Sequence, residues 1–584
     1  MTKTVKALCI VVGLFCVLWG LAPKGTSKIA MSETDQIKGV WAATLYSMDY
    51  PSKPTTDADT LRRDADRLIS AVSEHGFNAL FIQVRPSGDA FYKSEIYPIS
   101  RYLTGTEGTA PTDGFDPLDY IVEKAHKSGI AVHAWINPYR ITASEKDSEN
   151  LSEGSIAKKY PHLIVKHTDS KLYLNPGEPE AMDLVVGGAE EIAKNYKVDG
   201  IHIDDYFYPS SAFPDGETFT KYGGGFLNIG DWRRDNTAKL VEKMKTAIKR
   251  INPNIIFSAS PCGIWANKSS NAEGSHTSGK QAYFDYFADT RLWAREGLVD
   301  MIIPQVYWET GNSLADFQTV AKWWNDQLQD TNTILCIGQG VYKTAEATDT
   351  ASPWYDEKGR AEIENQLRYI KGLENVRGYV QYRIGSITSN PELSRHIKTI
   401  NTSTLRIFSD TKDYPWAEDS IERLYKSGIV KGMGDGSFGC KRWVSRADFM
   451  VMLVRLTGQN VAFTENFADV TKDKYYYNEI GTAKALGFAV GRENNIFDPQ
   501  GNITREDMAT LVWRVMTKMG KLPESADISL EEKFSDANEI SEYAKNAVSI
   551  LVKEKLLSGY ETGEFKPKGY ATRAECAVVL DRLN

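Results

Sequence analysis

The sequence predicts an α/β fold class: a (β/α)8 TIM-type barrel over residues 31–400, followed by a mostly α-helical domain of three repeats over residues 405–584. Three observations carry this prediction. The 584 residues exceed the length of one ordinary domain. Apolar runs alternate with amphipathic stretches before residue 400, which is typical of a parallel sheet covered by helices. Three related segments then recur in the rest of the chain.

Eight apolar runs are the candidate barrel strands. Eight strand and helix units favour a closed barrel, whereas a doubly wound open sheet would show a glycine-rich phosphate turn after its first strand, and none follows Thr44. Helices are expected at Leu61–His75, Pro117–Ser128 and Ala181–Tyr196, where apolar residues recur every three or four positions. The expected strands are Lys38–Thr44, Ala79–Val84, Ala131–Ile136, Gly200–Asp205, Ile255–Pro261, Asp300–Tyr307, Ile334–Val341 and Gly378–Ile384.

The three recurring segments share their motifs and their spacing. Each contains a Phe-Ser/Ala-Asp motif, a helix, a glycine-rich turn and a Ser/Thr-Arg motif, and the offset from the Phe to the Ser or Thr is 37 or 38 residues. A Ser or Thr with an acid three positions later is a capping-box pattern, which predicts that a second helix begins there. The fixed offset indicates a repeat module, with repeats at 408–455, 467–515 and 534–584.

Residues 1–30 have the pattern of a secretory signal or an uncleaved N-terminal anchor. Lys3 and Lys6 precede an apolar run that extends to Ala22, which is short for a membrane-spanning helix. We therefore expect an exported protein. The six cysteines form no C-x-x-C pair and two of them lie in the leader, so no disulfide framework is expected.

Composition narrows the classes of ligand. The net charge of −8 disfavours nucleic-acid binding, which needs a basic surface. Aromatic residues make up 11% of the chain, which favours a ligand with flat apolar faces such as a sugar, although most single rings are expected in the core.

Polar and aromatic residues follow several of the predicted strands. In a (β/α)8 barrel the carboxyl ends of the strands meet at one face and carry the active site. Aromatic rings there can stack on sugars while amide and guanidinium groups hold hydroxyls. The candidate substrate-binding residues are Arg85, Trp135, Asn137, Tyr139, His202, Tyr206, Gln305, Tyr307 and Trp308.

The adjacent acids Asp204 and Asp205 close the fourth predicted strand. Glycoside hydrolysis needs two carboxyl groups, one as proton donor and one as nucleophile or base. Because side chains alternate along a strand, the two acids are expected on opposite faces, so that one of them pairs with an acid from another strand. Glu309, after the sixth strand, is the first candidate for this partner. The reserve candidates are Asp89, Glu178, Glu180 and Glu273.

Other hydrolytic chemistries have weaker motifs. His202, Asp204 and Asp205 could supply metal ligands, but no H-E-x-x-H spacing is present, and we expect neither a metal nor a cofactor. No G-x-S-x-G sequence supports a serine nucleophile.

The three repeats resemble S-layer homology (SLH) repeats. The resemblance rests on the F-[SA]-D motifs, the glycine-rich turns and the [ST]-R-[AE]-[DE] motifs, and covers about residues 405–584. It implies a three-pronged helical module that binds pyruvylated secondary cell-wall polymers. By this resemblance Arg446, Arg505 and Arg573 would face the anionic polymer, and a guanidinium group suits a carboxylate. The second turn, Gly491–Asn495, departs from the pattern because it lacks the second glycine.

The barrel is similar to the glycosyl-hydrolase-like 10 proteins over roughly residues 37–390. The motifs that carry this resemblance are GVWAATLYSMDYP, FIQVRPSGDAFY, AWINPYRI, LNPGEPEAM, DGIHIDDYFYP, DWRRDN, SPCGIWAN and PQVYW. The resemblance implies a glycosidase-type barrel, and one branch of the family cleaves peptidoglycan glycan strands that have lost their peptides. The chain lacks that branch's lipoprotein box, so that the repeats would supply attachment instead.

Three functions are consistent with these patterns. The first is an exported, wall-attached glycoside hydrolase that cleaves peptidoglycan glycan or a related envelope polysaccharide. The second is a non-catalytic glycan-binding surface protein on the same scaffold. The third is a deacetylase or other metal hydrolase, which a chelator would inhibit.

Overall fold

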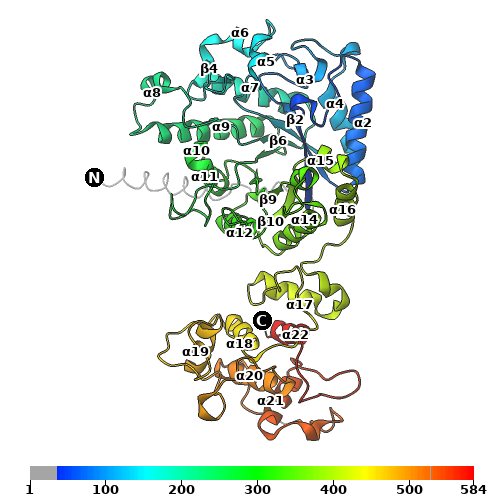
Figure 1. The fold of residues 1–584 in the computed structure, drawn as a ribbon, viewed down its shortest axis with the longest axis vertical. Coiled ribbons are helices and arrows are strands. Elements are labelled where there is room, and N and C mark those ends of the chain that lie inside the picture. The colour runs from blue at the N-terminus through cyan, green and yellow to red at the C-terminus, as the bar shows by residue number, and fades with distance from the viewer. Residues whose placement is uncertain (1–35, 527, 584) are drawn as a thin grey trace, which may run out of the picture.

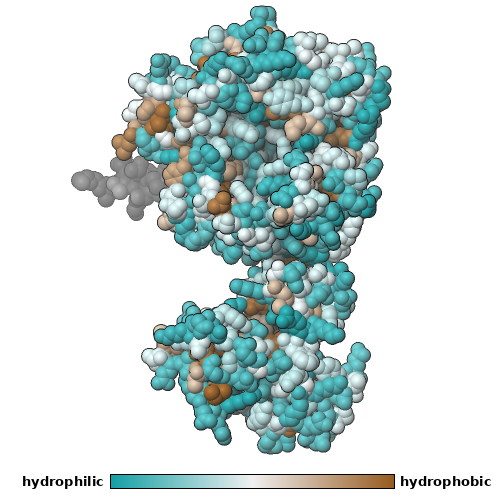
Figure 2. All heavy atoms as spheres, viewed as in Figure 1, coloured by the Kyte–Doolittle hydropathy of each residue, from teal (hydrophilic) through white to brown (hydrophobic). Residues whose placement is uncertain are grey.

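The computed structural model describes residues 36–526 and 528–583, which form a barrel part and a smaller helical part (Figure 1). The predicted signal or anchor at residues 1–30 lies outside the described residues. Figure 2 shows that hydrophilic residues cover most of the visible face of both parts. Among the described residues, no helix is long and apolar enough to cross a membrane.

Eight parallel strands close into a barrel in the order β1-β10-β9-β8-β7-β6-β3-β2, which confirms the predicted fold class. Each strand overlaps one of the eight expected apolar runs. Their observed bounds are β1 Ile37–Ala42, β2 Ala79–Arg85, β3 Ala131–Ile136, β6 Gly200–Ile203, β7 Ile256–Ala259, β8 Met301–Ile302, β9 Ile334–Gln339 and β10 Val376–Gln381.

Helices surround the strands in Figure 1, and the three that the sequence predicts are present as α2, α4 and α7. Asp57 and Asp116 begin α2 and α4 by accepting backbone N–H groups of the first turn. The helices of this part are α2 Ala58–Glu74, α3 Arg101–Thr104, α4 Pro117–Lys127, α5 Glu145–Glu149, α6 Ile156–Lys159, α7 Pro179–Asn195, α8 Gly216–Tyr222, α9 Ile229–Ile251, α10 Ala282–Asp285, α11 Thr290–Arg295, α12 Phe317–Gln327, α13 Tyr342–Glu346, α14 Asp356–Lys371, α15 Ile384–Ser389 and α16 Pro391–Thr402.

Two apolar clusters stabilise the barrel. The larger one lies between the strands and the surrounding helices. A smaller one fills the barrel interior, where Trp41, Phe81 and Val380 point inward from β1, β2 and β10. The interior below the active-site end is therefore a packed core, as in other barrels of this class.

An antiparallel hairpin interrupts the β/α alternation between β3 and β6. It consists of β4 (Ile164–Lys166) and β5 (Leu172–Leu174), and its strands are too short to have been recognised in the sequence. Tyr173 in β5 pairs with Arg140, so the hairpin lies against the segment that follows β3.

The last barrel helix ends at the amino-terminal face of the barrel. Near the end of α16, Asn401 donates to the carbonyl oxygen of His75 at 2.9 Å. The amino group of Lys38, near the start of β1, donates to the Asn401 carbonyl oxygen. The chain therefore leaves the barrel opposite the carboxyl ends of the strands, and the helical part follows there (Figure 1).

The helical part contains the three repeats, and its hydroxyl caps are as the sequence predicts. Ser445, Thr504 and Thr572 each accept the backbone N–H three residues later, and Thr572 forms a reciprocal box with Glu575. The helices are α17 Pro415–Lys426, α18 Arg446–Thr457, α19 Tyr477–Ala485, α20 Arg505–Lys518, α21 Glu542–Lys553 and α22 Arg573–Asp581.

Candidate active site

A cavity of about 240 Å³ opens at the carboxyl ends of the barrel strands. Its walls combine aromatic rings, two carboxyl groups, one guanidinium group and a few amide and hydroxyl groups, a composition that suits a carbohydrate. The lining residues are Trp41, Ala43, Leu45, Met48, Gln83, Trp135, Arg140, Asp204, Asp205, Tyr206, Ser260, Gln305, Tyr307, Tyr342 and Tyr382.

Asp204 and Asp205 both line this cavity. The expectation that they point to opposite faces is wrong, because β6 ends at Ile203 and strand alternation no longer applies beyond it. Asp204 is buried, whereas Asp205 is half-buried. The two acids therefore form a pair within one cavity, and among the residues that the structure describes no carboxyl group from another strand lines it.

Three donors hold the carboxylate of Asp204. The indole Nε1 of Trp135 donates to Oδ2 at 3.1 Å, and the amide of Asn137 donates to the same oxygen at 3.1 Å. The backbone N–H of Tyr206 donates to Oδ1 at 3.4 Å. Burial raises the pKa of Asp204, while the charge of Arg140 and these hydrogen bonds oppose that rise by favouring the ionised form.

Asp205 has a different environment from its neighbour. Burial raises the pKa of Asp205 to about 7, and the adjacent negative charge of Asp204 adds to the effect. A carboxyl group with this pKa still holds its proton in a large fraction of molecules at neutral pH. Two carboxyl groups whose surroundings differ in this way can take the roles of acid and base.

His202 lies beneath the cavity and does not line it, contrary to its prediction as a substrate-binding residue. Its side chain is fully buried, and Nε2 accepts the indole N–H of Trp41 at 3.3 Å. Nδ1 therefore carries the hydrogen and donates to Ser258 at 2.8 Å. Burial lowers the pKa of His202 well below its usual value, so that the ring is neutral. His202 supports Trp41 and Ser260, both of which line the cavity.

Four of the predicted substrate-binding residues reach the cavity: Trp135, Tyr206, Gln305 and Tyr307. Arg85, Asn137, Tyr139 and Trp308 do not line it.

Arg85 fails to reach the cavity because of a change in strand register. Gln83 of β2 pairs with Trp135 of β3, but the register shifts by one residue after this pair. Arg85 therefore pairs with Ile136, the residue directly after Trp135. Its guanidinium group lies over the ring of Tyr97, 4.4 Å from the centroid, and is buried. A bulge of this kind leaves no mark in the apolar pattern of the sequence.

Glu309 also lies outside the cavity lining. Its carboxylate accepts the indole N–H of Trp354 at 3.0 Å and the amide of Asn312 at 2.7 Å. These contacts hold the loop after β8 against the segment before α14. The structure therefore does not bring Glu309 together with the two aspartates.

The reserve acids do not line the cavity either. Asp89 is buried and accepts the hydroxyl of Ser100 at 2.6 Å. Glu178 precedes α7, and Glu180 and Glu273 pair with His162 and Arg291. Within the residues that the structure describes, no group of three or more His, Cys, Asp or Glu side chains could hold a metal ion.

Several cavity residues were missed by the sequence analysis, although a signal for them exists. Residues two positions apart in a strand share a face, so Trp41 at the end of β1 and Ala43 just after it point to the same side. Gln83 shares a face with Phe81, the partner of Trp41 in β2. Tyr342 follows β9 and Tyr382 follows β10, where a barrel places its site residues.

The three arginines of the repeats join neighbouring repeats in a cyclic pattern. Arg446 donates to the carbonyl of Phe497, Arg505 to that of Phe565 and Arg573 to that of Phe438, at 2.8–3.0 Å. Arg446 and Arg505 are buried and pair with Asp507 at 3.1 Å and Glu575 at 3.3 Å. Arg573 is more exposed and has no ion pair among the described residues. The expectation of three arginines on an open surface is therefore wrong for Arg446 and Arg505.

The comparisons with known proteins cover both parts of the chain. Glycosyl hydrolase YngK of Bacillus subtilis is 38% identical over 370 residues, which are 62% of this chain and 71% of that protein. Glycosyl hydrolase DigH of Escherichia coli K12 is 36% identical over 380 residues, 62% of this chain and 86% of that protein. Exoglucanase XynX of Acetivibrio thermocellus is 35% identical over 174 residues, 30% of this chain and 16% of that protein.

Two families match the chain in sequence. The S-layer homology domain matches at residues 407–450, 466–509 and 533–577, which confirms the resemblance of the repeats. The family described as Glycosyl hydrolase-like 10 matches residues 36–356, more than half of the chain and most of the barrel. The chain therefore belongs to the glycosyl hydrolase-like 10 family, with three S-layer homology repeats after the barrel.

Proposed function

We propose that this protein is a cell-surface glycoside hydrolase that cleaves peptidoglycan glycan strands or a related envelope polysaccharide. The observation that carries the proposal is the pair Asp204 and Asp205, two carboxyl groups with unlike surroundings in one aromatic-lined cavity. The family and the names of YngK and DigH, both glycosyl hydrolases, support the reaction class.

In this mechanism Asp205 is the proton donor. Its raised pKa keeps a proton available near neutral pH, and its half-buried position lets it reach a glycosidic oxygen in the cavity. As the bond to the leaving sugar breaks, positive charge develops at the anomeric carbon and the ring oxygen. The Asp204 carboxylate, held by Trp135 and Asn137, supplies the negative charge that stabilises this transition state. A water molecule adds to the anomeric carbon, and the proton that it loses restores the protonated carboxyl group of Asp205.

The aromatic walls bind and orient the sugar chain. Trp41, Tyr307 and Tyr382 line the cavity together with Trp135. Tyr307 and Tyr382 stack with ring centroids 6.1 Å apart, which makes a broad apolar surface for a pyranose ring. Gln83 and Gln305 supply amide groups to sugar hydroxyls.

The repeats would hold the enzyme at the cell wall by binding a secondary wall polymer. Arg573 is the best placed of the three arginines for an anionic ligand, because it is half-buried and forms no ion pair among the described residues, whereas Arg446 and Arg505 each pair with a carboxylate. A guanidinium group of this kind can bind a carboxylate of the polymer.

The test is cleavage of purified glycan strands. The full chain is incubated with peptide-free glycan, and the products are separated and weighed by mass spectrometry. Fragments that appear with the native protein and are absent with the Asp205→Asn variant support the proposal. Binding without fragments would identify a non-catalytic glycan-binding protein instead.

A further inference from the structure

A second cavity, of about 280 Å³, adjoins the catalytic cavity. The two share the lining residues Leu45, Arg140 and Tyr206, so they lie side by side in the surface. The remaining lining residues are Tyr46, Ala143, Asp169, Lys171, Tyr173 and Pro209, most of them from the segment after β3 and the β4–β5 hairpin.

The second cavity contains two cations and one anion. Arg140 donates through Nε and Nη2 to the carbonyl oxygen of Pro86, at 3.0 and 2.6 Å, while Nη1 forms no hydrogen bond within the described residues. Its guanidinium group lies 5.3 Å from the ring centroid of the exposed Tyr206. Lys171 lies 3.1 Å from Asp169, which also accepts the hydroxyl of Tyr173 at 3.0 Å. Arg140 and Lys171 are therefore the cations of this lining and Asp169 is its anion, and the charge of Arg140 also acts on Asp204 in the first cavity.

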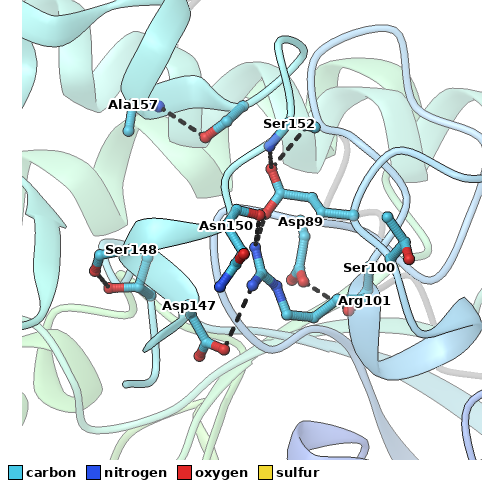
Figure 3. Close-up of polar contacts among 12 residues, drawn as sticks. Asp89, Ser100, Arg101, Asp147, Ser148, Asn150, Ser152 and Ala157 are labelled. Carbon is cyan, nitrogen blue, oxygen red and sulfur yellow. Dashed lines mark hydrogen bonds and ion pairs between the residues drawn. The ribbon is translucent and has the colours of Figure 1, made fainter. Parts of the chain in front are cut away.

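A half-buried polar network lies behind one wall of this cavity. Figure 3 shows Arg101 directed toward Asp147, at 3.5 Å, and toward the carbonyl oxygen of Asn150, at 2.9 Å. Asp147 in turn accepts the backbone N–H of Ala143 at 3.3 Å. The hydroxyl of Tyr46 donates to the Ala143 carbonyl at 3.0 Å. Both Tyr46 and Ala143 line the cavity, so the network holds two of its lining residues in place.

We propose that the second cavity is a subsite for a sugar unit that carries a carboxylate, in the same glycan that is cut in the catalytic cavity. The inference rests on the proposed function and specifies its substrate class. A chain bound at Asp204 and Asp205 would reach the second cavity by passing over the exposed Tyr206, which lines both cavities. A carboxylate there would accept hydrogen bonds from the free Nη1 of Arg140 and from the amino group of Lys171. A neutral sugar would form weaker hydrogen bonds with these two cations.

The carboxylate can have two chemical origins, a lactyl ether on the sugar or a uronic acid ring. The experiment therefore compares N-acetylglucosamine–N-acetylmuramic acid oligosaccharides with hexuronate-containing oligosaccharides of the same length. Each is also tested after its carboxyl groups have been reduced to alcohols. The measured quantity is the ratio of kcat/KM for the carboxylate form to kcat/KM for the reduced form.

For the native protein we expect a ratio of about 10 or more with one of the two classes, since a hydrogen bond to a charged group contributes strongly. Lys171→Gln should lower that ratio about fivefold, and Asp169→Asn should raise it, because these variants remove opposite charges. Salt should lower the native ratio. Lys166→Gln is the matched control, since Lys166 lies on the same hairpin but outside both cavities.

A native ratio near one with both classes would overturn the subsite. So would Lys171→Gln and Asp169→Asn ratios that change no more than the Lys166→Gln ratio. The opposite expected signs guard against a general loss of folding. Affinity ratios measured with the Asp205→Asn variant test the subsite even if no glycan is cleaved, whereas absence of any cleavage by the native protein refutes only the proposed function.

Discussion

The indole of Trp135 donates a hydrogen bond to Asp204, with Nε1 3.1 Å from Oδ2. The amide of Asn137 reaches the same oxygen, and together they stabilise the ionised form of a buried acid. Asp205, one residue later, keeps its proton more readily because burial and the neighbouring charge raise its pKa. The difference in protonation between the two acids therefore depends on the groups that surround each of them.

Replacing the proton donor should nearly abolish turnover. We expect Asp205→Asn to lower kcat about 1,000-fold on natural glycan, since general acid catalysis contributes about 10²–10⁴-fold. Glu309→Gln is the matched control: it also removes a carboxylate near the barrel mouth, but one that hydrogen-bonds Trp354 and Asn312 outside the cavity. Initial rates of fragment release measure both. If the two variants lose comparable amounts of kcat, Glu309 is a catalytic residue after all.

The activity should depend on pH on both sides of an optimum. Asp205 must be protonated and its pKa is about 7, so kcat/KM should fall as the pH rises through about 7. Asp204 must be ionised, and burial raises its pKa, so activity should also fall on acidification, beginning above the usual range of an aspartate. Rates from about pH 4 to about pH 9 test this. The Asp205→Asn variant can be assayed on a substrate with an activated leaving group, which does not need a proton donor. If kcat/KM of this variant still falls at alkaline pH, Asp205 is not the group that causes the fall.

Asn137 should act through Asp204 as a positioning residue. In Asn137→Ala the carboxylate loses one donor to its charged form, so the pKa of Asp204 should rise and the acid limb of the pH profile should move to higher pH. We expect kcat at neutral pH to fall about tenfold. The pH profile distinguishes this role from simple disruption, which would lower the rate at every pH without moving the limb.

The cyclic arginine contacts predict an effect on stability rather than only on binding. Arg505→Ala removes the cation that pairs with the half-buried carboxylate of Glu575 and leaves two carbonyl groups without a donor. We expect the repeats to lose about 2–4 kcal/mol of unfolding free energy. Arg492→Ala is the control, since the exposed pair with Asp498 contributes less than about 1 kcal/mol. Denaturant unfolding measures both, and equal midpoints would show that Arg505 has no structural role.

Much of the fold could be predicted because its signals are repetitive. The apolar strands and the amphipathic helices α2, α4 and α7 recur with ordinary periods, and hydroxyl caps mark the starts of helices in all three repeats. The short hairpin β4–β5 and the one-turn helices could not be recognised, because segments of three to six residues carry too little pattern.

The candidate site was harder to predict than the fold. The rule that site residues follow the strands predicted that Asp204, Asp205 and Tyr307 would lie at the site, and all three line the cavity. Local backbone geometry decided the remaining positions. The register shift after Gln83 turned Arg85 outward, and the end of β6 at Ile203 allowed two adjacent acids to share one cavity. Neither the register shift nor the end of the strand alters the pattern of apolar and polar residues from which strands are predicted.

The exit of the chain beside His75, at the barrel face remote from Asp205, has a consequence for how the enzyme would work on a cell. If the repeats bind the wall, the catalytic mouth lies at the end of the barrel that the repeats leave uncovered. Attachment to the wall would then leave the cavity open to long glycan strands.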